Sequence, residues 1–133
     1  SKNSLQDIPS SLFSDLISLE SLNLANNHIQ TIQTGAFSGL SALTELILGG
    51  NEELQIHSDS AIFSPLSGLV HLDLSGPSTA NMKSLDAGIF HGLGNVLEVV
   101  LPASIDTIGA GAFSGLSAIA SLDLSPLNLR TLE

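Results

Sequence analysis

Apolar residues recur along the chain at a fixed spacing that begins at phenylalanine. Each unit reads Phe-x-x-Leu-x-x-Leu-x-x-Leu-x-Leu, with Val or Ile at some of the Leu positions. The stretch 35–43 returns almost unchanged as 111–119, so one structural unit is repeated along the chain. Every phenylalanine of the chain starts one unit, and these are Phe13, Phe37, Phe63, Phe90 and Phe113.

The spacing within each unit predicts a short strand at its end. The last two apolar residues are two positions apart, as in Leu22-Asn23-Leu24, which places both side chains on one side of an extended strand. The distance from Phe to the last apolar residue is always 11 residues, whereas successive Phe are 24, 26, 27 and 23 residues apart. Blocks of constant length joined by variable arcs are typical of a solenoid. We predict five parallel strands, with the phenylalanine rings stacked on the far side of the core.

The apolar pattern resembles that of leucine-rich repeat proteins. The segment Leu19-x-x-Leu22-x-Leu24-x-x-Asn27-x-Ile29-x-x-Ile32, followed by Gly35-Ala36-Phe37, has the signature of the Phe-containing repeat, and residues 101–113 are similar to the BspA-like repeat. The resemblance implies an α/β fold, a right-handed horseshoe of about five coils with a parallel sheet on its concave face. It further implies mostly loops and short 3-10 or helical turns on the convex face, ligand binding to the concave face, and a secreted or cell-surface location.

The repeats define one domain, residues 1–133. Full repeats are predicted at 19–42, 43–68, 69–95 and 96–118, with partial coils at 1–18 and 119–133. Because a single coil buries too few side chains to be stable alone, stability must come from stacking. Partial coils at both ends suggest a piece of a longer solenoid, or ends that are covered by something else.

One position of the leucine-rich repeat signature is occupied by different residues along the chain. In leucine-rich repeat proteins an asparagine after each strand ties together the following turn. Asn27 and Asn51 occupy this position, and with the five phenylalanines they form the predicted structural core. Pro77, Ser104 and Leu127 occupy the same position later, so we expect less regular turns in the last three units.

The charge of the chain limits its partners. The net charge is −10, and the only basic residues are Lys2, Lys83 and Arg130. Nucleic acid binding needs clustered Lys and Arg, so we expect no nucleic acid partner. There is no apolar run long enough to cross a membrane, so we expect no membrane insertion. A protein partner that is basic or neutral fits this charge better.

No catalytic chemistry is indicated by the sequence. There is no cysteine, no Gly-x-Ser-x-Gly motif and no glycine-rich phosphate loop. His28, His57 and His91 have no partners at a metal-ligand spacing and are expected at the surface. We therefore predict no enzyme activity, no cofactor and no metal site.

The residues that flank the inward leucines are the candidates for binding, because they should face the concave surface. They form two columns, which are Ser21, Glu45, His71, Glu98, Ser121 and Asn23, Ile47, Asp73, Val100, Asp123. Parallel strands lie about 4.8 Å apart, so His71 is expected between Glu45 and Glu98. This ionisable group has three interpretations: a solvated face, an acidic recognition surface, or a weak cation site.

Two hypotheses about function follow. The first is a non-enzymatic recognition module that binds a protein through its concave face. The alternative is a structural building block whose coil ends stack on neighbouring subunits, because exposed terminal leucines are unfavourable in water. A surface that binds an ordered lattice is a weaker third idea, and the expanded arcs 51–63 and 75–90 are expected to be plain surface loops. The predicted contact residues are Asn23, Glu45, Ile47, His71, Asp73, Glu98, Val100 and Asp123.

Overall fold

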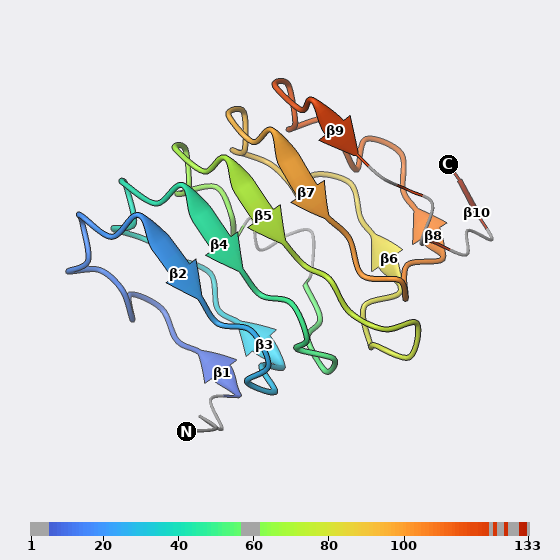
Figure 1. The fold of residues 1–133 in the computed structure, drawn as a ribbon, viewed down its shortest axis with the longest axis horizontal. Helices are drawn as coiled ribbons and strands as arrows, with labels where there is room; N and C mark the ends of the chain where they lie inside the picture. Colours follow the sequence, from blue (N-terminus) through green and yellow to red (C-terminus); the bar gives the residue numbers. More distant parts are fainter. Residues whose placement is uncertain (1–5, 57–61, 123, 125–126, 128–130, 133) are drawn as a thin grey trace.

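The chain folds into a solenoid built around one parallel sheet (Figure 1). The computed structural model describes residues 6–56, 62–122, 124, 127, 131 and 132. The sheet has five strands in the order β2-β4-β5-β7-β9, and each strand comes from a successive repeat. The strands are β2 (Ser21–Asn23), β4 (Glu45–Ile47), β5 (His71–Asp73), β7 (Glu98–Val100) and β9 (Ser121–Leu122).

The predicted register of this sheet is confirmed. Leu46 pairs with Leu22 on one side and with Leu72 on the other, and Val99 continues the row. The side chains of Leu46, Leu72 and Val99 are buried, because alternate residues of a strand point to opposite faces. The residues between the inward leucines therefore lie on the other face of the sheet.

A second row of short strands runs along one side of the solenoid (Figure 1). Among the described residues these strands form two parallel sheets, β1-β3 and β6-β8-β10. The family resemblance implied mostly loops and short 3-10 or helical turns away from the main sheet, and the short strands of this second row were not predicted. The strands are β1 (Asp7–Ile8), β3 (Thr31–Ile32), β6 (Ser84–Leu85), β8 (Thr107–Ile108) and β10 (Thr131–Leu132).

An apolar-x-x-apolar pattern marks this second row. Ile29 and Ile32 are both buried, and so are Ile105 and Ile108. Such a pair fixes the extended backbone between its two anchors against the core, and the backbones of neighbouring coils then pair. Asp106 N, for example, donates to Lys83 O at 2.8 Å. The sequence signal was present, but a spacing of three residues does not by itself indicate a strand.

The Phe-x-x-Leu-x-x-Leu segment is a chain of turns. Leu40 N donates to Phe37 O and Leu43 N donates to Leu40 O, both at 3.3 Å. Each three-residue step of the pattern thus closes one turn and returns an apolar side chain to the core. Since these hydrogen bonds are not consecutive, the described residues form no α-helix and no 3-10 helix here. The helical turns implied by the family resemblance are replaced by turns of this kind.

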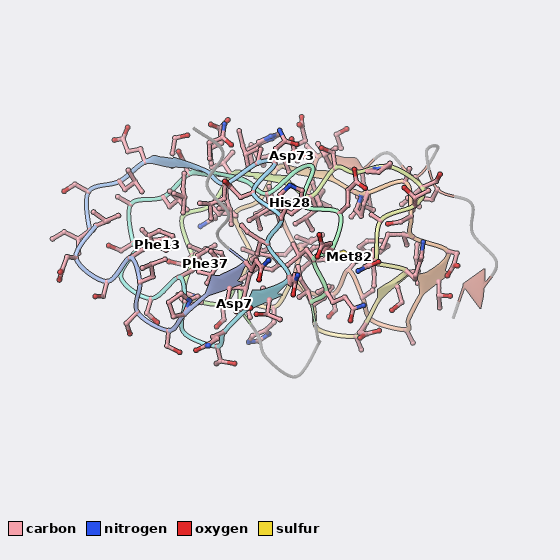
Figure 2. The ribbon with its side chains drawn as sticks, turned by 90° about the horizontal axis from the view of Figure 1, so that it is seen from below. Asp7, Phe13, His28, Phe37, Asp73 and Met82 are labelled. Carbon is pink, nitrogen blue, oxygen red and sulfur yellow. The ribbon has the colours of Figure 1, made fainter. Side chains whose placement is uncertain are left out.

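The phenylalanine rings fill the interior of the coils, and Figure 2 shows Phe13 and Phe37 next to each other. Phe37 stacks on Phe13 with ring centres 6.3 Å apart, and on Phe63 at 6.2 Å. Phe90 stacks on Phe113 at 6.1 Å. Among the described residues no stacked pair joins Phe63 to Phe90. The predicted single column of five rings is therefore two shorter columns.

Asn51 ties two coils together through both ends of its amide group. Its Nδ2 donates to Leu48 O at 2.7 Å and to Leu24 O of the preceding coil at 3.0 Å. Its Oδ1 accepts from Asn27 N at 2.9 Å and from Ile29 N at 3.0 Å. The side chain is buried, so it satisfies four backbone groups that are shielded from water.

The other repeats hold the corresponding turn with fewer hydrogen bonds. Asn27 itself donates only to Leu24 O and Ala25 O, both within its own coil. Ser104 occupies the same position two coils beyond Asn51, is buried, and donates its hydroxyl to Met82 O of the preceding coil. A serine thus keeps one hydrogen bond between coils where the asparagine is lost.

We expect Gly92→Ala to destabilise the protein more than Gly88→Ala. Both glycines have positive φ angles, +91° and +76°, which alanine adopts at a cost of about 1 kcal/mol. A Cβ at Gly92 would also lie 2.6 Å from Ser64 Cα, whereas a Cβ at Gly88 would meet nothing within 4 Å. Urea unfolding followed by circular dichroism measures both losses.

The difference between these two variants reports the steric clash alone. Gly92→Ala is expected to cost about 2 kcal/mol more than Gly88→Ala, because backbone atoms of the preceding coil must move. Equal losses in the two variants would show that the coils are not packed as closely as the structure has them.

Candidate partner-binding face

The outer face of the five-stranded sheet, called here the sheet face, carries two rows of side chains. The strand register places Glu45 beside His71 and His71 beside Glu98, as predicted. The first row consists of the residues just before the buried central residue of each strand, and the second row consists of the residues just after it. The charged row is Ser21, Glu45, His71, Glu98 and Ser121, and the inner row is Asn23, Ile47, Asp73 and Val100. Asp123 lies outside the described residues.

Side chains of the charged row pair along the sheet. Ser21 Oγ donates to Glu45 Oε1 at 2.7 Å, and His71 Nδ1 lies 3.0 Å from Glu98 Oε1. His71 thus sits between two carboxylates in register and contacts only the one on β7. The His71 and Glu98 side chains are 30% and 55% exposed, so their interaction adds at most about 1 kcal/mol to stability. Both carboxylates keep an oxygen available to a partner.

Two residues of the inner row have a structural role as well. Asp73 Oδ1 accepts a hydrogen bond from Ser75 N at 2.8 Å, and Asn23 Oδ1 accepts one from Ala25 N at 3.0 Å. Each side chain holds the turn that leaves its strand. Asp73 and Asn23 therefore contribute to the shape of the sheet face in addition to any contact with a partner. Figure 2 places Asp73 at the edge of the molecule.

A row of residues directly before the strands, called here the border row, was not included in the sequence-based candidates. Within it Val70 and Leu97 are exposed, by 37% and 46%. The sequence signal for this pair is that Val70 and Leu97 are apolar although they lie outside the repeat positions that point into the core. Apolar character alone does not show whether a side chain is exposed. The border row is Glu20, Thr44, Val70, Leu97 and Ala120.

The structure gives no support to the cation-site interpretation. Among the described residues, no three or more His, Cys, Asp or Glu side chains are grouped so that they could hold a metal ion. Of the other histidines, His28 lies 3.7 Å from Glu53 and His91 is exposed, while His57 lies outside the described residues.

The expanded arcs contact each other on the side of the second row of strands. Asn81 N donates to Glu52 O at 2.7 Å, and Ala80 N closes a turn on Pro77 O. Two shallow hollows lie beside these arcs and share Gln55. Both lie away from the sheet face. No helix among the described residues is long and apolar enough to span a membrane.

Comparisons with known proteins agree with the repeat pattern. A leucine-rich repeat model matches residues 1–52, and a model of the BspA-type leucine-rich repeat region matches residues 74–133. Keratocan of Gallus gallus is 33% identical over 125 residues, which are 92% of this chain and 33% of keratocan. Tsukushi of Rattus norvegicus is 40% identical over 89 residues, 65% of this chain and 24% of that protein.

Among solved structures, the crystal structure of a TLR13–ssRNA13 complex is similar to this fold. It superimposes with a TM-score of 0.67 at 31% sequence identity, and covers 94% of this chain and 16% of the TLR13 chain. The chain thus spans a third or less of the length of these relatives.

Proposed function

Because the chain belongs to the leucine-rich repeat family, we propose that it is a non-enzymatic recognition module that binds a protein partner through the sheet face. The observation that supports this proposal is the register of the five strands, which brings ionisable and apolar side chains from different repeats onto one surface. The proposed contact residues are those predicted from the sequence: Asn23, Glu45, Ile47, His71, Asp73, Glu98, Val100 and Asp123. A secreted or cell-surface location is part of the proposal and is supported by the similarity to keratocan, Tsukushi and TLR13.

The charge of the sheet face favours a protein partner over nucleic acid. Its described residues include Glu45, Asp73 and Glu98 but no Lys or Arg. Phosphate groups would meet carboxylates there, which is unfavourable at any ordinary salt concentration. The RNA in the similar TLR13 complex is therefore not proposed as a partner type for this chain. End-to-end stacking into a larger assembly stays an untested hypothesis.

Reversing two charges of the sheet face is expected to weaken partner binding. The double variant Glu45→Lys/Glu98→Lys should lower affinity for a basic protein partner about tenfold or more, because a complementary charge becomes a repulsive one. Partners can be found by probing an array of purified secreted proteins with the parent chain, and affinities then measured by biolayer interferometry. Asp73 is left unchanged because it also holds the turn at Ser75.

A matched control separates the sheet face from net charge. Asp15→Lys/Glu52→Lys changes the net charge by the same four units, from −10 to −6, at exposed residues outside the sheet. This control is expected to bind within about twofold of the parent, and both double variants should keep the melting temperature of the parent. Equal loss of binding in both variants would place the site elsewhere or reduce it to a long-range charge effect.

A further inference from the structure

Two exposed apolar side chains lie next to the charged row. Val70 and Leu97 directly precede β5 and β7, and Leu97 N donates to Val70 O at 2.9 Å, so their backbones are adjacent. The same position in neighbouring coils is Glu20 or Thr44 on one side and Ala120 on the other. A pair of large exposed apolar side chains is thus confined to the border of β5 and β7.

Apolar side chains also lie on the opposite side of the charged row. Ile47 and Val100 are half-buried in the inner row and flank Asp73 in register. The His71–Glu98 pair therefore has Val70 and Leu97 on one side, and Ile47 and Val100 with Asp73 between them on the other. At the edge of the sheet, β2 and the residue before it carry only polar residues at the corresponding positions, which are Glu20, Ser21 and Asn23.

The ion pairs and the apolar contacts of this surface would contribute differently to binding of a partner. An exposed ion pair contributes little net free energy to binding, so carboxylates alone give little affinity. Burying the exposed parts of a valine and a leucine contributes about as much or more, and adjacent charges then select the partner and speed its approach. A partner that matches both features needs large apolar side chains next to positive charge.

We infer that the sheet face binds a cationic segment of a protein partner in which a large apolar residue neighbours Lys or Arg, centred on β5 and β7. The apolar residue packs on Val70 and Leu97, and the cation meets Glu98. The second half of the segment extends toward Glu45 on β4. This inference rests on the proposed function and specifies its partner class and the residues that provide affinity.

The experiment is a selection from a random-peptide phage library on the immobilised parent chain. Enriched peptides are synthesised, and their dissociation constants are measured by fluorescence polarisation. Enriched sequences are expected to contain Lys or Arg beside Leu, Ile, Phe or Trp. Val70→Ser/Leu97→Ser is expected to weaken their binding about tenfold or more, because the apolar contact is lost.

The matched control removes exposed apolar side chains outside the sheet. Leu12 and Ile17 are 46% and 64% exposed in the first coil, and Leu12→Ser/Ile17→Ser is expected to bind the peptides within about twofold of the parent. Circular dichroism checks that each variant melts as the parent does. An equal loss in the control would show that any exposed apolar residue suffices, and would overturn the inference.

The remaining outcomes separate this inference from the proposed function. If Glu45→Lys/Glu98→Lys removes binding while Val70→Ser/Leu97→Ser has no effect, the sheet face binds partners but the apolar pair does not take part. Enriched peptides that lack basic residues, or no enrichment at all, also overturn the inference. If neither double variant changes the affinity of an enriched peptide, both the inference and the proposed function fail.

Discussion

Replacing Phe63 by alanine is expected to lower the free energy of unfolding by about 3–5 kcal/mol. Phe63 is fully buried in the third coil and its ring stacks on Phe37 of the second, with ring centres 6.2 Å apart. Its loss leaves a cavity between two coils, and the contacts between neighbouring coils are a main source of stability in a solenoid. Urea unfolding followed by far-ultraviolet circular dichroism is the suitable measurement, because the chain has no Trp or Tyr.

Phe63→Leu is the matched control for this variant. Leucine keeps the buried aliphatic contact and loses only part of the ring volume, so its cost should be about 1–2 kcal/mol. The contrast tests whether the ring fills space between coils. Unfolding curves of Phe63→Ala that superimpose on those of the parent would show that the phenylalanine position is not part of the core.

The second large effect is expected for Asn51→Ala, at roughly 3–5 kcal/mol. The substitution leaves three backbone groups without their partner, Leu48 O, Asn27 N and Ile29 N, whereas Leu24 O keeps the hydrogen bond from Asn27 Nδ2. Each unsatisfied buried group costs about 1–3 kcal/mol, and water reaching some of them reduces the total. Urea unfolding gives the loss, and amide hydrogen exchange should show faster exchange at Asn27 and Ile29.

Asn23→Ala serves as the control at a residue of the same type. Asn23 is exposed and accepts one hydrogen bond, from Ala25 N at 3.0 Å, so its removal should cost about 0.5–1 kcal/mol. A cost for Asn51→Ala no larger than that for Asn23→Ala would mean that the turn does not depend on this amide.

The two halves of the solenoid are built differently, and two observations place the change after Asn51. The asparagine position becomes Pro77 in the third coil, and no stacked ring pair among the described residues joins Phe63 to Phe90. The two family models likewise match on either side, at 1–52 and 74–133. The main sheet continues across this change, because β4 pairs with β5.

The rows of the candidate binding face could be predicted because alternation along a strand and a constant repeat length fix the register. Glu45, His71 and Glu98 are neighbours for this reason. The sequence could not show which carboxylate His71 contacts, since both lie one strand away. It also could not show that Asp73 holds a turn, or that Val70 is exposed. These depend on side-chain rotamers and on the path of the backbone just outside the strands.

The sequence by itself determined the repeat and the five-stranded parallel sheet, because the spacing of apolar residues is imposed by the geometry of one coil and is independent of the others. Only the tertiary structure decided the second row of strands and the interruption of the ring stack. Both arise from backbone and ring positions in neighbouring coils, and arcs of different length shift those positions. The pairing of Ser21 with Glu45 and of His71 with Glu98 was decided at the same level, by side chains that meet only when the coils stack.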